Sequence, residues 1–235
     1  MPSHFAPEIR ITGLSTPNLH TLNTPLGATI EEQATATLNA MRSTWDPAKE
    51  YPTYSFVRQP QTFPDVRLVL APGVSTGAPI IMGIELKGWY VFAREGVPTY
   101  RFTTTPEACA PADLLVVVPW ALSEVISGRP IMFAPYIESA RYAAEMRNYY
   151  WRHGRKSTGA SRNIETPDQP RPYPAKADKI TDIPEHDGGG NFGRIARTGL
   201  MEGYVKGIKQ LPLSGVPIER WLKFFQSLAD EPVPD

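Results

Sequence analysis

The sequence is poor in cysteine and has neither a long apolar stretch nor an excess of either charge. Cys109 is the only cysteine, which excludes an intramolecular disulfide and a cysteine-rich zinc site and favours a reducing compartment. No stretch approaches the roughly 20 apolar residues that span a bilayer, and the first residues lack a signal-peptide pattern. We therefore expect a cytoplasmic protein that does not contact a membrane.

The charges balance at 24 basic against 24 acidic residues, so the chain is neither a polycation nor an acidic tail. A surface for nucleic acid would have to be local, because binding to phosphates needs clustered positive charge. Hydrophobic residues make up 41% of the chain, which is typical of a globular protein, whereas the 25 prolines indicate many irregular connections. The length of 235 residues fits one domain with a sizeable core.

We divide this single domain into four segments. Residues 1–28 are expected to form an irregular N-terminal arm with a short strand at residues 8–11, and residues 29–154 the core. Residues 155–193 are rich in Pro, Gly and charge and are expected to form a long loop, which in a compact domain is usually functional or mobile and is here a candidate for DNA recognition. Residues 194–235 form a helical closing segment.

The first half of the core is predicted to contain one helix and a hairpin. Apolar residues at steps of three or four predict a helix that begins at residue 29 and is stopped by Asp46 and Pro47. A period of two and a high content of Val, Ile, Tyr and Phe predict a β-hairpin of residues 65–70 and 80–92.

Further elements complete the predicted sheet and its cover. Residues 98–102 are expected to add a strand, and the apolar run at residues 113–118 predicts a strand buried on both faces and ended by Pro119. Helices are predicted at residues 136–153, before Gly154, and at residues 218–228. The fold class expected is α/β, with a central mixed β-sheet flanked by helices.

The predicted hairpin brings two carboxylates and an amine together. Strand alternation puts Glu85 and Lys87 on the same face, and Asp65 begins the partner strand close to them. Hard divalent cations such as Mg²⁺ take carboxylate and carbonyl oxygens as ligands, so Asp65, Glu85 and the backbone carbonyl of Leu86 form a candidate metal clamp. Water would fill the remaining positions, with Lys87 beside it.

The pattern reads Pro64-Asp65, nineteen intervening residues, then Glu85-Leu86-Lys87. It resembles the pattern of the PD-(D/E)XK nuclease superfamily, mainly over residues 54–118. The resemblance implies a restriction-endonuclease-like fold in which Asp65 and Glu85 bind Mg²⁺, with Mn²⁺ able to substitute, and Lys87 orients or deprotonates the attacking water. Glu31, on the preceding helix, matches the position from which some members supply a further acidic group.

The small size and long loops resemble type II restriction endonucleases, which implies a homodimer that cuts double-stranded DNA at a specific sequence. Two other functions stay open: a structure-specific nuclease of the repair or resolvase kind, and a DNA-binding module without catalysis. A carboxylate and a lysine that merely pair on the surface of a strand, worth at most about 1 kcal/mol, are a further alternative.

Basic residues gather in and after the helix predicted at residues 136–153, interleaved with aromatic residues. Arg147 projects onto the apolar face of that helix, where an unpaired guanidinium is costly, so it needs a carboxylate or phosphate partner or must reach water. The candidates for contact with nucleic-acid phosphates are Arg147, Arg152, Arg155, Lys156, Arg162 and Arg194.

Overall fold

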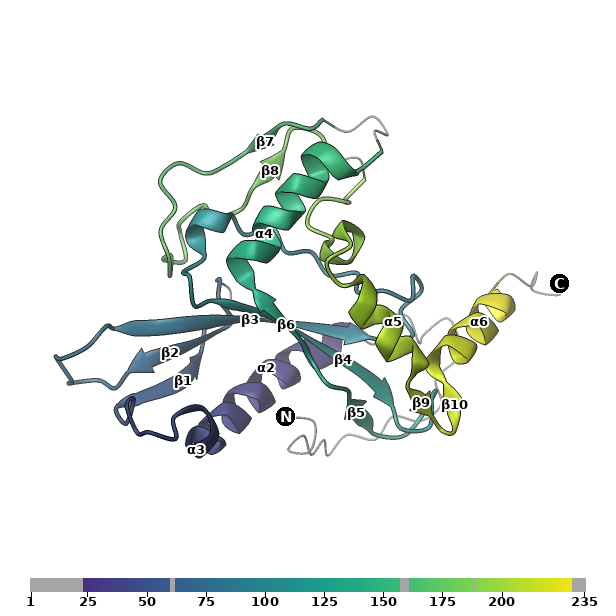
Figure 1. The fold of residues 1–235 in the computed structure, drawn as a ribbon, viewed down its shortest axis with the longest axis horizontal. Helices are drawn as coiled ribbons and strands as arrows, with labels where there is room; N and C mark the ends of the chain where they lie inside the picture. Colours follow the sequence, from purple (N-terminus) through teal and green to yellow (C-terminus); the bar gives the residue numbers. More distant parts are fainter. Residues whose placement is uncertain (1–22, 60–61, 157–160, 188, 230–235) are drawn as a thin grey trace.

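A computed structural model describes residues 23–59, 62–156, 161–187 and 189–229 (Figure 1), and the strand predicted at residues 8–11 lies outside them. Within these residues, six strands form a central sheet in the order β1-β2-β3-β4-β5, with β6 also paired to β4. Strands β3 and β4 run parallel, and the other neighbours run antiparallel. The predicted mixed sheet is confirmed. Its strands are β1 (Tyr54–Arg58), β2 (Val66–Leu70), β3 (Ile80–Tyr90), β4 (Leu114–Leu122), β5 (Pro130–Met132) and β6 (Tyr136–Ser139).

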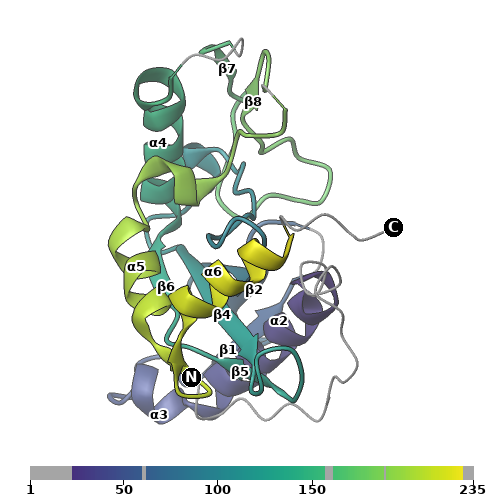
Figure 2. The same cartoon turned by 90° about the vertical axis from the view of Figure 1, so that its right-hand side faces the viewer.

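Two helices lie on opposite sides of this sheet (Figures 1 and 2). Helix α2 (Asn23–Ala40) lies below it and α4 (Ala140–Tyr149) rises above it, which confirms the flanking helices. The remaining helical elements are α3 (Arg42–Trp45), η2 (Pro106–Ala108), η3 (Tyr150–Gly154), η4 (Ile195–Thr198), α5 (Glu202–Gln210) and α6 (Ile218–Ala229). Two short pairs of strands complete the fold: β7 (Ile164–Glu165) with β8 (Ile183–Pro184), and β9 (Pro212–Leu213) with β10 (Val216–Pro217).

The first predicted helix begins at Asn23, earlier than expected, and is interrupted at Met41, so that α2 ends at Ala40 and only the short α3 reaches Trp45, just before the predicted stop at Asp46. Residues 23–28 are helical and not part of an irregular arm. Pro25 sits in the first turn, where the missing N–H costs nothing. At the other end, the buried carboxylate of Asp46 accepts hydrogen bonds from the backbone N–H groups of Glu50 (2.7 Å) and Tyr51 (3.0 Å). These bonds stabilise the turn that leads into β1.

Strand β4 does not end at Pro119 but continues to Leu122. β6 pairs with residues 114–117 of β4, whereas β5 pairs with residues 120–122. Pro119 lies between these two pairings, so its missing N–H breaks neither ladder. The prediction was wrong because a proline ends a central strand only where a neighbour requires its donor.

Helix α4 starts four residues later than predicted, because residues 136–139 form β6. Tyr136 pairs with Val117 in the sheet, and the Ser139 hydroxyl then caps the helix by accepting the N–H of Tyr142 (3.3 Å). The apolar positions of the strand coincided with the helical period, which misled the prediction. The end at Gly154 is confirmed, since α4 passes into the π-helical turn η3.

The strand predicted at residues 98–102 is not present. This segment makes an isolated bridge between Arg101 and Arg194, and the N–H of Phe102 donates to the carbonyl of Gly193 (2.8 Å). It therefore joins the end of the long loop and not the central sheet. The closing helix predicted at residues 218–228 is confirmed as α6, whereas α5 was not predicted.

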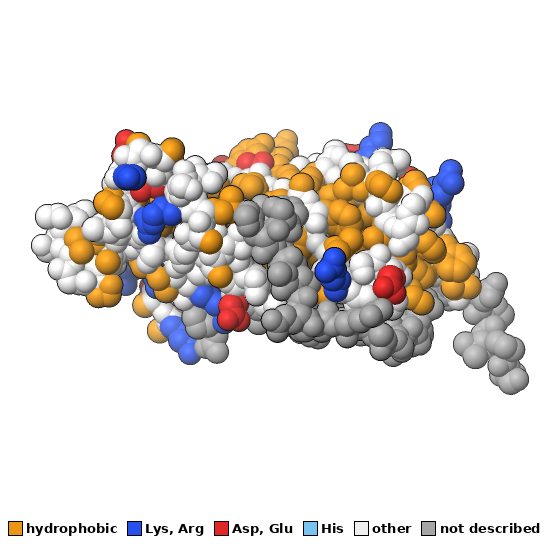
Figure 3. Space-filling model, turned by 90° about the horizontal axis from the view of Figure 1, so that it is seen from below, with side chains coloured by type: hydrophobic (Ala, Val, Ile, Leu, Met, Phe, Trp, Pro, Cys, Tyr) orange, Lys and Arg blue, Asp and Glu red, His pale blue; other side chains and the backbone are white. Residues whose placement is uncertain are grey.

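Apolar side chains gather on part of the underside of the molecule (Figure 3). They lie over the half of the molecule that carries α6. Exposed apolar side chains of that helix include Phe224 (50%) and Leu228 (40%). Lys and Arg side chains in this view are dispersed, so this face has no basic strip among the residues drawn in colour. Among the described residues, no helix is both long and apolar enough to cross a membrane.

Candidate active site

The register of the β2–β3 hairpin places Asp65 opposite Glu85. Val66 pairs with Ile84 and Arg67 with Gly83, and Asp65 precedes β2 in the same register. Directly opposed residues of an antiparallel pair share a face, and alternate residues along each strand do so too. Asp65, Glu85 and Lys87 therefore lie on one face, while the intervening apolar side chains are buried on the other face.

Direct contacts join these three residues. The Leu86 N–H donates to Asp65 Oδ2 at 2.7 Å, which holds the carboxylate against β3. Lys87 Nζ lies 2.6 Å from Glu85 Oε1 and 4.0 Å from Asp65 Oδ2. Their side chains are 10 to 22% exposed, so the cluster is largely buried but keeps some contact with solvent. The structure thus brings together the three side chains that the sequence pattern singled out.

Glu31 approaches this cluster from helix α2 without contacting it. Its carboxylate forms an ion pair with Arg58 at 2.7 Å. Its negative charge nevertheless acts on both Asp65 and Lys87 and raises their pKa values. Glu31 is therefore part of the electrostatic environment of the site, with Arg58 as its partner.

The carboxylates and the amine shift one another's protonation. Burial raises the pKa of Asp65 to about 7, and the charge of Glu85 adds to the rise against the attraction of Lys87. Burial also disfavours the charged form of Lys87, but the attraction of Glu85 and Asp65 outweighs it, so the pKa of the ammonium lies above its ordinary value. At neutral pH Lys87 is a cation, and Asp65 is divided between its two protonation states.

The oxygen atoms of the cluster fit a hard divalent cation. Glu85 Oε2 is buried and has no hydrogen-bond partner among the described residues. Burying such an oxygen costs free energy unless a cation or a water molecule binds to it. Within the described part of the chain, no three His, Cys, Asp or Glu side chains form a ready-made metal cage. A cation would be held by Asp65, Glu85, the predicted Leu86 carbonyl and water, a set of ligands that Mg²⁺ accepts.

Gly83 and Asp113 support the geometry from one side. A Cβ on Gly83 would lie 2.2 Å from Cγ of Pro64, so only glycine lets the residue before Asp65 pack against β3. Asp113 Oδ1 accepts the Gly83 N–H (2.7 Å) and the Tyr173 hydroxyl (3.1 Å). The long loop is therefore attached to the strand that carries Glu85, two residues from that carboxylate.

Arg67 belongs to the same face and was missed by the sequence analysis. It is two residues from Asp65 on β2 and pairs with Gly83, which offers no side chain beside it. Its Nε is buried without a hydrogen-bond partner among the described residues, and burial lowers its pKa while Tyr173 raises it. The alternation that grouped Glu85 with Lys87 would also have grouped Arg67 with Asp65, but no motif drew attention to it.

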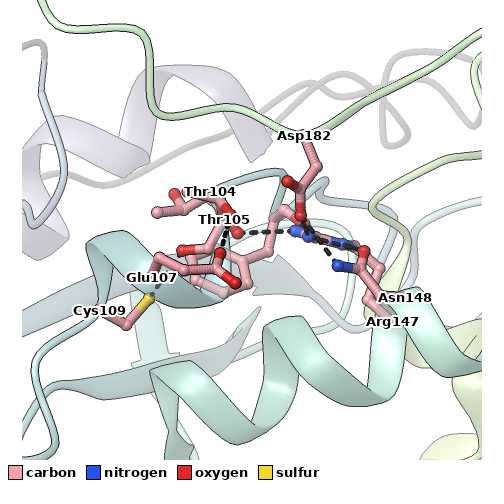
Figure 4. Close-up of polar contacts among 8 residues, drawn as sticks. Thr104, Thr105, Glu107, Cys109, Arg147, Asn148 and Asp182 are labelled. Carbon is pink, nitrogen blue, oxygen red and sulfur yellow. Dashed lines mark hydrogen bonds and ion pairs between the residues drawn. The ribbon is translucent and has the colours of Figure 1, made fainter. Parts of the chain in front are cut away.

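Arg147 is a structural residue, which corrects its prediction as a nucleic-acid contact. Its side chain is 2% exposed and forms an ion pair with Asp182, which is 0% exposed (Figure 4). The guanidinium also donates to the carbonyls of Phe102 (2.8 Å) and Thr104 (2.9 Å) and to Asn148 Oδ1 (2.9 and 3.1 Å). The expected carboxylate partner is therefore Asp182, and all three guanidinium nitrogens donate to groups within the protein.

The other predicted contact residues differ in how available their charge is. Arg152, Lys156 and Arg162 are exposed, while Arg155 stacks its guanidinium 3.8 Å from the ring centroid of Trp151. Arg194 is already bound, because its Nη1 lies 2.7 Å from Glu95 Oε1. The exposed positive charge therefore lies at the end of α4 and the start of the long loop, and Arg194 contributes little to it.

Comparison of the chain with models of protein families, with curated proteins and with solved structures found no match. The geometry of the site therefore carries the functional argument.

Proposed function

We propose that the protein is a Mg²⁺-dependent nuclease that hydrolyses phosphodiesters of double-stranded DNA, with a restriction-endonuclease-like fold. One observation carries the proposal: Asp65, Glu85 and Lys87 meet on one face of the hairpin, and a buried carboxylate oxygen of Glu85 has no partner among the described residues. A Glu85–Lys87 ion pair alone does not require a second carboxylate, and burial together with the charge of Glu85 raises the pKa of Asp65, a pattern that is common at functional sites.

The roles of the residues follow from their charges. When bound, Mg²⁺ would neutralise the negative charge that develops on the phosphate and would lower the pKa of a bound water molecule. Asp65 and Glu85 would hold the ion through deprotonated oxygens, so Asp65 must lose its proton first. Because the pKa of Lys87 lies above its ordinary value, its ammonium orients the attacking water and offsets transition-state charge, and does not act as the base.

Within this activity we favour a type II site-specific deoxyribonuclease that acts as a homodimer in the cytoplasm. The length of the loop at residues 161–187 and its attachment to Asp113 through Tyr173 support this choice, because a loop fixed beside the catalytic strand can position residues that read bases. Two-fold symmetry would let each subunit cut one strand of a palindromic site. Mn²⁺ is expected to substitute for Mg²⁺.

Digestion of a defined supercoiled plasmid with Mg²⁺, followed by sequencing of fragment ends, tests the proposal. Asp65→Asn and Glu85→Gln should lower the cleavage rate by about 10²-fold or more, and Lys87→Met should lower turnover while DNA affinity is retained. Glu32→Gln, an exposed carboxylate on α2, is the matched control and should cut at the wild-type rate. Wild-type cleavage by Glu85→Gln would refute the mechanism.

The same digestion separates the related functions. Discrete fragments support a restriction enzyme, whereas preference for branched over linear substrates would indicate a repair or resolvase-like nuclease. Tight DNA binding without cleavage in either Mg²⁺ or Mn²⁺ would indicate a module that binds DNA without cutting it.

A further inference from the structure

A second site, apart from the carboxylates, is built at the upper end of α4 (Figure 1). There a pocket of about 380 Å³ lies between the π-helical turn η3, with the two residues after it, and residues 191–197, which extend into η4. Its described lining residues are Tyr150, Trp151, Gly154, Arg155, Lys156, Asn191 and Arg197. Three of them are cations and none is a carboxylate.

Trp151, one of the lining residues, is held by contacts on several sides. Trp151 is 2% exposed, donates its Nε1–H to the carbonyl of Ser161 (2.9 Å) and packs edge-on against Phe192, with ring centroids 5.2 Å apart. The guanidinium of Arg155 lies over the Trp151 ring at 3.8 Å. Stacking fixes the plane of an arginine and leaves its edge free to donate two parallel hydrogen bonds, the geometry that matches a phosphate.

The positive charge of the pocket is largely uncompensated. Among the described residues, neither Arg155 nor Lys156 forms an ion pair with a carboxylate. Arg197 has Glu95 at 3.4 Å, but that carboxylate is shared with Arg194, which it contacts at the shorter distance of 2.7 Å. A pocket with an excess of cations attracts an anion, and arginine forks select phosphate among anions.

We infer that this pocket binds a backbone phosphate of the DNA substrate, as an anchor apart from the catalytic site. The inference rests on the proposed function for the source of the phosphate. Helix α4 starts beside Asp113, whose carboxylate contacts Gly83 near the catalytic strand, and it ends at the pocket. Its ten residues span roughly 15 Å, which corresponds to about four or five nucleotides along a strand at about 3.4 Å each.

A polymer fits the surroundings better than a free nucleotide does. Exposed Arg152 precedes the pocket and exposed Arg162 follows it along the chain, so positive charge continues past the pocket on both sides. A site for one small phosphate needs no such continuation, whereas a phosphodiester backbone meets cations along its length.

Binding of a fluorescently labelled DNA duplex, measured by anisotropy across a series of salt concentrations in metal-free buffer, tests the inference. Arg155→Gln and Lys156→Gln should each reduce the slope of log K against log salt by about 0.9, the value for one lost phosphate contact. Arg171→Gln is the matched control, because Arg171 lies in the same long loop, its side chain is 73% exposed and it is 3.7 Å from Asp178. Its slope should equal that of the wild type.

Lys156→Gln keeps the test valid if Arg155→Gln fails to fold, because Lys156 is exposed and has no buried role. Unchanged slopes in the folded pocket variants, or an equal fall in Arg171→Gln, would overturn the inference. Competition arms with deoxyadenosine monophosphate and inorganic phosphate separate the sources of phosphate. If the variants lose binding of either small ligand but keep the wild-type DNA slope, the pocket serves a small ligand and the DNA assignment is wrong.

The binding assay and the cleavage assay fail independently. A protein that binds DNA through Arg155 and Lys156 but never cuts it would refute the nuclease and leave the anchor in place. A protein that cuts DNA with unchanged salt slopes in both variants would refute the anchor alone.

Discussion

The molecule contains two clusters of buried charge that are built in opposite ways. Around Arg147 and Asp182 the charges cancel, the side chains are 2% and 0% exposed, and all three guanidinium nitrogens donate hydrogen bonds. Around Asp65, Glu85 and Lys87 two carboxylates face one amine and the side chains keep 10 to 22% exposure. One carboxylate oxygen in each cluster, Asp182 Oδ1 and Glu85 Oε2, has no hydrogen-bond partner in the described structure, so the clusters differ in charge balance and exposure. The first cluster is closed and the second is open.

The difference separates a structural role from a functional one. The closed cluster carries no excess charge and is shut off from solvent, although Asp182 Oδ1 also lacks a hydrogen-bond partner among the described residues, so its worth lies in holding the long loop to the segment at residues 102–105. An open cluster is under-neutralised and therefore costs stability until a cation binds it. Burial alone would have ranked the Arg147 pair as the stronger functional candidate, and the balance of charges together with access to solvent reverses that ranking.

The largest effect is expected from breaking the closed cluster. Arg147→Met keeps the apolar volume but leaves Asp182 buried without its cation, and should lower the free energy of unfolding by about 3–5 kcal/mol. Urea denaturation followed by circular dichroism measures the loss. Arg152→Met, one turn along and exposed, should change stability by less than about 0.5 kcal/mol.

The double variant Arg147→Met with Asp182→Asn sharpens this test, because the amide removes the uncompensated charge. It should be more stable than Arg147→Met alone. If the double variant is no more stable than the single one, the loss comes from packing and the ion pair is not its cause.

Removing a charge from the second cluster should raise the free energy of unfolding, whereas removing Arg147 from the first cluster should lower it. The folded-state pKa of Asp65, about 7, lies above the ordinary 3.8, so between these values the native state binds more protons and stability falls as the pH rises. Asp65→Asn removes this penalty and should raise the free energy of unfolding at pH 8 by at least about 1 kcal/mol, since one unit of pKa shift corresponds to about 1.4 kcal/mol.

Urea denaturation in metal-free buffer at pH 4, 6 and 8 checks this expectation. The gain in the free energy of unfolding should be smallest at pH 4. At that pH Asp65 is protonated in the folded state, and the pH is close to the ordinary pKa of 3.8 that applies to the unfolded chain. Glu32→Gln should show no such trend. A variant less stable than the wild type at pH 8 would mean that Asp65 holds the hairpin together through Leu86 more than its charge disturbs it.

The two clusters also differ in how far the sequence predicted them. Asp65, Glu85 and Lys87 lie on one hairpin, where a period of two decides which side chains share a face, so local pattern sufficed. Arg147 required a partner by the same kind of reasoning, but Asp182 lies 35 residues away in a segment without periodicity, and nothing local identifies it. Partners across long irregular loops are set by tertiary packing.

The errors in the predicted elements have the same origin. Pro119 is tolerated in β4 because two different strands pair on either side of it, and residues 136–139 form a strand because β4 offers them an edge. Neither fact is present in the local sequence. The hairpin and the closing helix were predicted correctly because each carries its own periodic pattern, and β4 was located, though not its end, because its apolar run is continuous.

The smallest effect on stability is expected from Arg67, which is the open cluster's counterpart to Arg147. Its Nε is buried with no partner in the described residues, so Arg67→Met breaks no ion pair and should change the free energy of unfolding by less than about 1 kcal/mol. If Arg67 contacts a phosphate beside the carboxylates, the same variant should raise KM more than it lowers kcat and should reduce the salt slope of DNA binding by about 0.9. Arg171→Met is the control for both measurements. A loss of stability close to that of Arg147→Met would show that Arg67 is a structural residue. The candidate site would then contain a structural arginine beside its functional carboxylates.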